Sequence, residues 1–227
     1  MYKIILVCCV ALFLSACARK PIEKPTQRVA KPVAYTPKPQ LIALDPGHGG
    51  TNEGAKLIIA PYTSEKIFTL KTAEKVEDFL VKWGYKVFMT RRSDVFIPLE
   101  ERVELARKKR CTLFVSIHYN STPKETLARG VEIYFYEKPR DARALHSKAL
   151  AKSIFKRFSQ VTQTSSRGVR PGNFSVIRET QVPAVLVEVA FLSNPEDAEE
   201  LKKDSYLTSS AWAIAKGIDD YVRHKNK

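Results

Sequence analysis

Two patterns of apolar residues alternate along the chain. Short, nearly continuous apolar runs predict buried strands over 41–45, 85–90, 112–117, 131–136, 174–177 and 184–189. Longer stretches in which apolar residues recur every three or four positions predict helices over 65–83, 98–110, 142–161, 195–202 and 206–222. Because strands and helices alternate, we expect an α/β fold. It would be a single domain with a mostly parallel, twisted sheet and helices on both faces.

Histidines follow two of the predicted strands. The first strand stops at the turn signal Asp-Pro-Gly at 45–47, and His48 comes next, between glycines. His118 directly follows the strand over 112–117. The carboxyl ends of parallel strands lie at one edge of a sheet, where such folds place their sites. We therefore expect the two imidazoles to lie close together.

Glu65 begins the next predicted helix and has two interpretations. A carboxylate at a helix start is favoured by the helix dipole and by capping, with no further role. The loop between His48 and Glu65, however, is long enough to bring the carboxylate back over the strand ends. A catalytic zinc site commonly has two imidazoles and one carboxylate as ligands, and it leaves one position open to water. His48, Glu65 and His118 supply this set, so we predict a zinc centre.

Glu188 interrupts a strand that would otherwise be continuously apolar, AVLVEVAF over 184–191. A carboxylate in such a strand is costly to bury unless a charge partner or a metal lies nearby. One interpretation is a structural ion pair with Arg178. The other is a general base, which takes a proton from zinc-activated water and passes it to a leaving amine. We favour the general base.

The first residues have the composition of a secretion signal. Lys3 gives a basic start, and the apolar segment over 4–14 is too short to span a bilayer. The sequence Leu-Ser-Ala-Cys at 14–17 resembles the lipobox of bacterial lipoproteins. That resemblance implies a signal peptide over 1–17 and lipid attachment at Cys17; the alternative is an ordinary signal with a chance cysteine. Ala18 after the cysteine favours the periplasmic face of the outer membrane in a two-membrane bacterium.

Residues 18–40 are rich in proline, lysine and arginine and contain almost no large apolar side chains. Such a segment cannot bury enough surface to fold, so it is predicted to be a tether between the lipid and a domain over 41–227. The whole chain has a formal net charge of +14, which suits an anionic polymer such as a cell wall. A basic chain also suits nucleic acid, but we expect no nucleic-acid partner for a secreted, lipidated protein.

Short motifs occur in order from the first predicted strand to the end of the last one. They are DPGHGG at 45–50, GA at 54–55, SEK at 64–66, MTRRSDVFIPLEER at 89–102, FVSIHYN at 114–120, RGV at 167–169 and PAVLVEVAFLSNPED at 183–197. As a series they resemble the zinc-dependent N-acetylmuramoyl-L-alanine amidases of the amidase_3 type. The similarity covers essentially all of 41–227. No single motif is decisive, whereas the ordered series is specific.

The resemblance implies a set of roles. His48, Glu65 and His118 would bind zinc, and Glu188 would be the catalytic glutamate. The implied reaction hydrolyses the amide between the lactyl group of N-acetylmuramic acid and L-alanine of the stem peptide in peptidoglycan, during wall remodelling or cell division. The segment over 167–178 resembles the family's substrate side. Arg170 and Asn173 are therefore candidates for contacting the peptide, with surface and turn roles as the alternative.

One departure from the family concerns regulation. Many members that act in cell division carry an extra helix that plugs the site until a protein activator removes it. The stretch between His118 and Gly130 is too short for such a helix. We therefore expect activity that depends on location and substrate access, without a plug that an activator must displace.

Three other hypotheses about the function remain open. A zinc carboxypeptidase acting within the stem peptide would use the same metal chemistry and a different pocket. A non-catalytic wall-binding lipoprotein would need no buried glutamate beside a metal. A penicillin-sensitive serine enzyme is suggested only by Ser-x-x-Lys at 121–124 and 153–156, and neither Ser-Asp-Asn nor Lys-Thr-Gly accompanies them.

Overall fold

The computed structural model describes residues 41–122, 127–161 and 167–224. The predicted signal peptide over 1–17, its lipidation site Cys17 and the tether over 18–40 lie outside the described residues. Among the helices of the described part, none is both long and apolar enough to cross a membrane.

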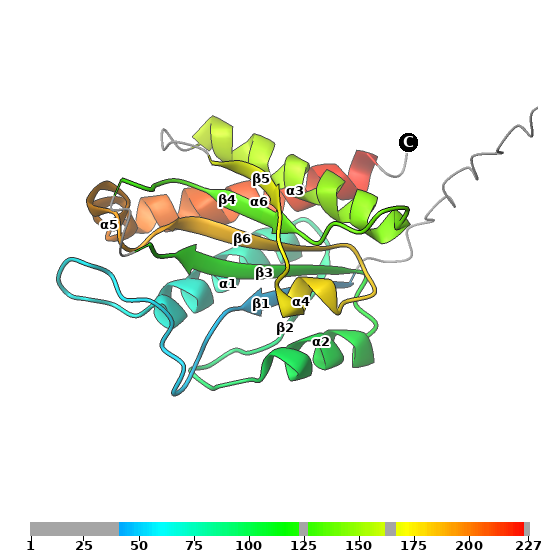
Figure 1. Cartoon of the computed structure of the whole chain (residues 1–227), viewed down its shortest axis with the longest axis horizontal. Helices are drawn as coiled ribbons and strands as arrows, with labels where there is room; N and C mark the ends of the chain where they lie inside the picture. The colour runs from blue at the N-terminus through cyan, green and yellow to red at the C-terminus, as the bar shows by residue number, and fades with distance from the viewer. Residues whose placement is uncertain (1–40, 123–126, 162–166, 225–227) are drawn as a thin grey trace, which may run out of the picture. The chain divides into compact units, whose positions relative to one another are not determined.

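A six-stranded sheet forms the centre of the domain, in the order β2-β1-β3-β6-β4-β5 (Figure 1). The strands are β1 Leu41–Pro46, β2 Lys86–Met89, β3 Leu113–Asn120, β4 Glu132–Phe135, β5 Gly168–Pro171 and β6 Ala184–Phe191. Strands β2, β1, β3 and β6 run parallel to one another, and β4 runs antiparallel to β6 and parallel to β5. The predicted α/β class with a mostly parallel sheet is confirmed.

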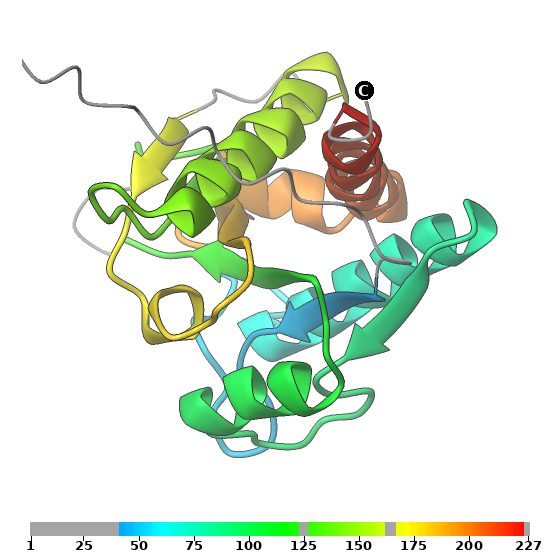
Figure 2. The same ribbon diagram turned by 90° about the vertical axis from the view of Figure 1, so that its right-hand side faces the viewer.

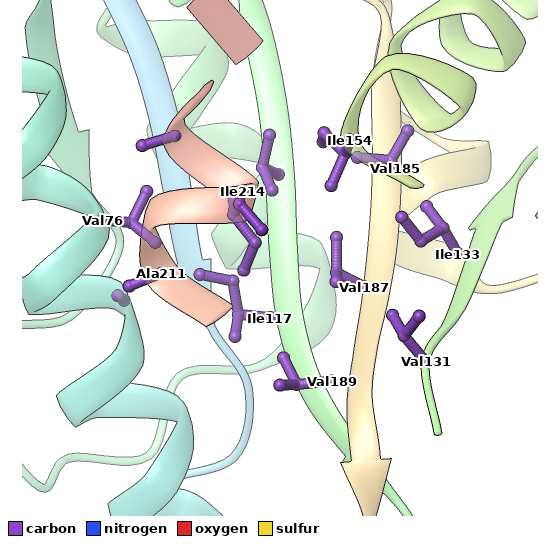
Figure 3. Close-up of a cluster of buried hydrophobic side chains, with 14 of the residues drawn as sticks. Val76, Ile117, Val131, Ile133, Ile154, Val185, Val187, Val189, Ala211 and Ile214 are labelled. Carbon is purple, nitrogen blue, oxygen red and sulfur yellow. The ribbon is translucent and has the colours of Figure 1, made fainter. Parts of the chain in front are cut away.

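Helices cover the two faces of the sheet unequally. They are α1 Glu65–Lys82, α2 Leu99–Lys108, α3 Ala142–Val161, α4 Ser175–Arg178, α5 Pro195–Leu201 and α6 Asp204–His224. The long helices α1, α3 and α6 pack against one face and enclose the main apolar core, part of which Figure 3 shows. The short helices α2 and α4 lie against the other face, over a smaller apolar cluster (Figure 2).

Alternation along β6 explains which residues reach each face. Val185, Val187 and Val189 belong to the main core, whereas Ala184 and Leu186 belong to the smaller cluster. Since successive side chains of a strand point to opposite faces, Glu188 lies on the less covered face. We therefore look for the site on this face, at the carboxyl ends of the parallel strands.

Two elements differ from the sequence prediction. Residues 174–177 were expected to form a strand, but Ser175–Arg178 form helix α4, whose Val176 and Ile177 are buried in the smaller cluster. An apolar pair in a segment this short fits either structure, and here packing against α2 and the sheet decides. Strand β5 was not predicted, because its sequence GVRP at the sheet edge has neither alternation nor an apolar run.

Candidate metal centre and catalytic glutamate

Three side chains from separate elements converge at the carboxyl ends of β1 and β3. His48 follows β1, Glu65 is the first residue of α1, and His118 lies near the end of β3. Oε1 of Glu65 lies 3.0 Å from Nε2 of His48 and 3.1 Å from Nδ1 of His118. One ligand atom from each residue lies within 4.8 Å of the others, so the three form a possible metal site.

Glu65 is the buried centre of this cluster. Its Oε1 accepts a hydrogen bond from the backbone N–H of Tyr119 at 2.9 Å, and its Oε2 accepts one from Ala55 at 3.0 Å. Burial on its own raises the pKa of Glu65, but the imidazoles of His118 and His48 bring it well below its usual range. The carboxylate is therefore held in its charged form and in one orientation.

The donor set fits a divalent metal ion. Burial on its own lowers the pKa of His48, but the carboxylate of Glu65 and the side chain of Asn52 raise it above its ordinary value. The cluster thus favours added positive charge, as a cation site must. Two imidazoles and one carboxylate are also the ligands that zinc takes in many catalytic sites.

Two buried arginines hold the turn that carries His48. Arg102 donates to the carbonyl oxygens of Pro46 and His48, each at 2.7 Å. Arg91 donates to the carbonyl oxygens of Pro46 at 3.0 Å and Gly47 at 2.9 Å. His48 has a φ of 61°, which is uncommon for a residue other than glycine. The two guanidinium groups therefore stabilise a strained turn and fix the direction of the imidazole.

Asp45 supports the same turn from inside the sheet. It is fully buried and accepts hydrogen bonds from Thr90 Oγ1 at 2.7 Å, Ser116 Oγ at 2.8 Å and Arg102 Nη1 at 2.9 Å. Its carboxylate compensates the charge of Arg102 and joins β1 to β3. The end of β1 is thereby tied to the strand that carries His118.

Gly47 leaves the space that the ring of His118 occupies. A Cβ added at Gly47 would lie 2.2 Å from Cε1 of His118, far inside contact distance. A Cβ added at Gly54 would lie 2.5 Å from Oε2 of Glu65, and Gly54 also has a φ of +68°. Gly47 of the DPGHGG motif and Gly54 of the GA motif are thus required by close approach to the three clustered side chains.

Glu188 lies beside the cluster with one oxygen unused. It is paired with His118 in the register of β3 and β6 and is 9% exposed. Its Oε2 is buried and has no hydrogen-bond partner within the described residues. Burial, followed by the nearby carboxylates of Glu65 and Glu132, raises the pKa of Glu188 well above its ordinary value. The alternative ion pair with Arg178 does not form, because Arg178 donates to Glu179 and Asn173.

A family model described as N-acetylmuramoyl-L-alanine amidase matches residues 42–220. The chain belongs to this family. Among its relatives, LytH of Staphylococcus saprophyticus, named as a probable cell wall amidase, is 34% identical over 192 residues, which is 85% of this chain and 60% of LytH. YqiI of Bacillus subtilis is 35% identical over 223 residues, which is 97% of each protein. This chain therefore spans less than two thirds of LytH and nearly all of YqiI.

The fold agrees with solved members of the family. The catalytic domain of CwlV, an N-acetylmuramoyl-L-alanine amidase from Bacillus (Paenibacillus) polymyxa, superimposes with a TM-score of 0.74 at 37% identity. The superposition covers 81% of this chain and 98% of that domain. The described residues thus form an amidase catalytic domain.

The two predicted peptide-contacting residues of this amidase domain lie near each other in sequence but differ in surroundings. Arg170 is on β5, half-exposed, with its Nε 3.7 Å from Oε1 of Glu132. The side chain of Asn173 accepts a hydrogen bond from Arg178 at 2.8 Å, as in the alternative turn role. Whether either residue contacts substrate stays a prediction.

Sequence reasoning missed a second buried glutamate in the amidase domain. Glu132 begins β4, is 2% exposed and is the register partner of Glu188. The signal that identified Glu188, a charge in an apolar strand, was also present in VEIYF at 131–135. Glu132 stands at the start of that predicted strand, where a charged residue is common, so it did not stand out.

Proposed function

We propose that this protein is an N-acetylmuramoyl-L-alanine amidase that cleaves the bond between N-acetylmuramic acid and L-alanine of the stem peptide in peptidoglycan. The observation that carries the proposal is the pairing of two features at one sheet edge. One is the cluster of His48, Glu65 and His118. The other is the buried, unused oxygen of Glu188, in register with His118. The substrate is inferred from membership of the amidase family.

The metal of this site is proposed to be zinc, held by His48, Glu65 and His118. When bound, zinc supplies a Lewis acid that polarises the scissile carbonyl and activates water at neutral pH. The donor set excludes magnesium and calcium, which prefer oxygen ligands, and leaves the first-row metals that imidazole suits. Among these we choose zinc, because two imidazoles and one carboxylate are a common catalytic zinc set. Metal analysis of the purified protein, compared with a His118→Ala variant, tests both identity and ligands.

Glu188 is proposed to carry the proton in this reaction. Its raised pKa and its free Oε2 suit a group that takes a proton from the attacking water and returns it to the leaving amine of L-alanine. Arg170 is proposed as a peptide contact because it is half-exposed on the strand beside Glu132. Asn173 is a second proposed contact that first has to leave Arg178.

The decisive experiment is digestion of purified peptidoglycan, with the products identified by mass spectrometry. The wild type should release intact stem peptides that begin with a free L-alanine. Glu188→Gln, which keeps the side-chain volume, and chelation of the metal should each abolish this product. Release of terminal D-alanine alone would assign the protein as a carboxypeptidase. Binding to peptidoglycan without any product would assign it as a wall-binding protein.

We also propose that the enzyme is anchored by lipid at Cys17 and acts on the periplasmic face of the membrane, with the outer membrane favoured in a two-membrane bacterium. The lipobox-like sequence at 14–17 and the basic, proline-rich segment over 18–40 support this placement. Cys17→Ser should move the protein from the membrane fraction to the soluble fraction while it keeps its activity on isolated peptidoglycan. The same purified protein should be active without a protein activator, because the sequence leaves no room for a plug helix between His118 and Gly130.

A further inference from the structure

Glu132 and Glu188 are two buried carboxyl groups that face each other across neighbouring strands. They are register partners in the antiparallel pair of β4 and β6. Directly opposite residues in such a pair point to the same face, with Cβ atoms about 4.5–5.5 Å apart. Like charges in this arrangement are costly to bury, so each group needs a reason to be there.

The two glutamates differ in how their oxygens are used. Oε1 of Glu132 accepts a hydrogen bond from Nε of Arg167 at 2.6 Å. Oε2 of Glu132 accepts from Nδ2 of Asn120 at 2.9 Å and from the hydroxyl of Tyr134 at 2.8 Å. Oε2 of Glu188, by contrast, has no donor within the described residues. Glu132 is therefore occupied and fixed, whereas Glu188 keeps an oxygen for chemistry.

The donors on Glu132 come from three different segments of the chain. Asn120 lies two residues after His118 on β3, and its own Oδ1 accepts from the backbone of Ser121 at 2.8 Å, which fixes the orientation of its amide. The ring of Tyr134 packs edge-on against Phe174, with ring centroids 5.0 Å apart. The guanidinium of Arg167 lies over the ring of Phe191 at 5.4 Å. One carboxylate thus joins β3, β4 and the entry to β5.

We propose that Glu132 is a positioning residue for the amidase reaction. It holds the amide of Asn120, the hydroxyl of Tyr134 and the guanidinium of Arg167 as one rigid cluster beside Glu188. This cluster fixes the orientation in which the scissile amide of the stem peptide meets the catalytic glutamate. The inference rests on the proposed function and adds a residue that the metal site and Glu188 do not include.

The test variant is Glu132→Gln, which keeps the volume but replaces one of the two acceptor oxygens by an amino group, so that a donor now at Oε1 or Oε2 loses its acceptor. Misplacement of a reacting group by about 1 Å typically lowers the rate on the order of 100-fold, so kcat on a soluble muropeptide should fall by about that factor. KM and the bound metal per folded molecule should change little, whereas the melting temperature should fall, because a buried carboxylate with three donors is lost. Assays are therefore made well below the melting temperature. A merely structural role would lower the fraction of folded, metal-loaded enzyme and leave kcat per folded molecule unchanged.

Glu179→Gln is the matched control. Glu179 accepts from Nε of Arg178 at 2.6 Å, the same distance as in the pair of Glu132 and Arg167, but its side chain is 54% exposed. The control removes the same kind of charge from the same kind of pair and should leave kcat unchanged. Equal kcat values for Glu132→Gln and the control would overturn the inference and leave the proposed function intact. Absence of stem-peptide release by the wild type would overturn both.

A second variant keeps the inference testable if Glu132→Gln does not fold. Tyr134→Phe removes one donor and leaves the carboxylate and the ring packing in place. We expect a smaller fall in kcat than for Glu132→Gln, with KM and bound metal unchanged, because only one of the three donors on Glu132 is lost. A Tyr134→Phe enzyme with wild-type kcat would contradict the proposal.

Discussion

The β1 side and the β6 side of the site each contain a buried carboxylate on a strand, and they treat it in opposite ways. Asp45 on β1 is 0% exposed and has donors from Thr90, Ser116 and Arg102. Glu188 on β6 is 9% exposed, and its Oε2 has no donor in the part of the chain that the structure describes. The first arrangement stabilises the fold and positions His48. The second costs stability and preserves reactivity, as functional sites commonly do.

The largest expected effect comes from the β6 side. Glu188→Gln should lower kcat by about 100- to 10,000-fold, the usual contribution of general acid–base catalysis. The melting temperature should stay the same or rise, since the change removes a buried carboxyl group whose pKa is raised by its surroundings. Steady-state kinetics and calorimetry on the same preparation measure both. A marked drop in melting temperature would mean that Glu188 also supports the fold.

The opposite result is expected on the β1 side. Arg102→Met leaves the buried carboxylate of Asp45 without its cationic partner, and breaking a buried pair in this way costs about 3–5 kcal/mol of folding free energy. Urea unfolding of the variant against wild type measures the loss. An exposed pair gives the comparison: Glu104→Gln, which loses its ion pair with Arg107 on α2, should change the unfolding free energy far less, because solvent screens that pair. Similar losses of folding free energy for the two variants would contradict the idea that the buried pair stabilises the fold more than the exposed pair.

Gly47→Ala tests the close contact between the turn after β1 and the ring of His118 on β3. The added Cβ would lie 2.2 Å from Cε1 of His118, so the ring must move. Metal affinity should fall on the order of 10- to 100-fold, the usual cost of disturbing the groups that orient a metal ligand. Gly84→Ala is the control for the added methyl group: a Cβ there meets nothing within 4 Å, and its φ of +86° makes the substitution a test of backbone strain without a steric clash. Competition with a chelator measures affinity, and equal values for the two variants would contradict the steric argument.

The smallest effect is a pH dependence at Asp219 on α6, a further buried carboxylate with donors. Burial on its own raises the pKa of Asp219, but hydrogen bonds from Lys216, Arg223 and Tyr85 bring it below its ordinary value. Between the lowered pKa of Asp219 and the ordinary pKa of aspartate, the unfolded chain binds more protons than the folded chain. The stabilisation is therefore present above the ordinary pKa of aspartate and is lost as the pH falls through the lowered one.

Asp219→Asn should flatten this acid-side loss of stability. The difference from wild type should be on the order of 1 kcal/mol near neutral pH and should shrink as the pH is lowered. Unfolding curves at a series of pH values measure it. Glu188→Gln is the matching comparison, because its stability difference from wild type should not follow this acid-side pattern. Parallel curves for Asp219→Asn and wild type would show that the three donors do not hold the pKa down.

The sequence revealed the reactive groups better than it revealed their support. Glu188 stood out because a charge in an apolar strand requires a cause, and the two histidines stood out because they follow strands. The ion pair of Asp45 and Arg102 joins residues 57 positions apart, so no local pattern marks it. The role of Glu132 likewise depends on Asn120 and Arg167, which reach it only after the strands are assembled.

The strand assignments follow the same rule. β1, β3 and β6 were predictable because strands buried on both faces are continuously apolar. Edge strand β5 and helix α4 were not, since each is four residues long and takes its conformation from its neighbours. Sequence patterns therefore predict the elements that form the core, and less of the short segments that border the site.

The antiparallel pairing of β4 with β6 makes activity a report on how the chain has folded. A strand that slips by one residue turns all its side chains to the opposite face. Such a slip of β4 would move Glu132 into the main core and bring Ile133 opposite Glu188, while the helices and most of the sheet stayed in place. The resulting molecule would be compact, and its spectroscopic signature close to native. Turnover would distinguish it from the correctly registered enzyme, which makes an activity assay the more sensitive test of refolding for this protein.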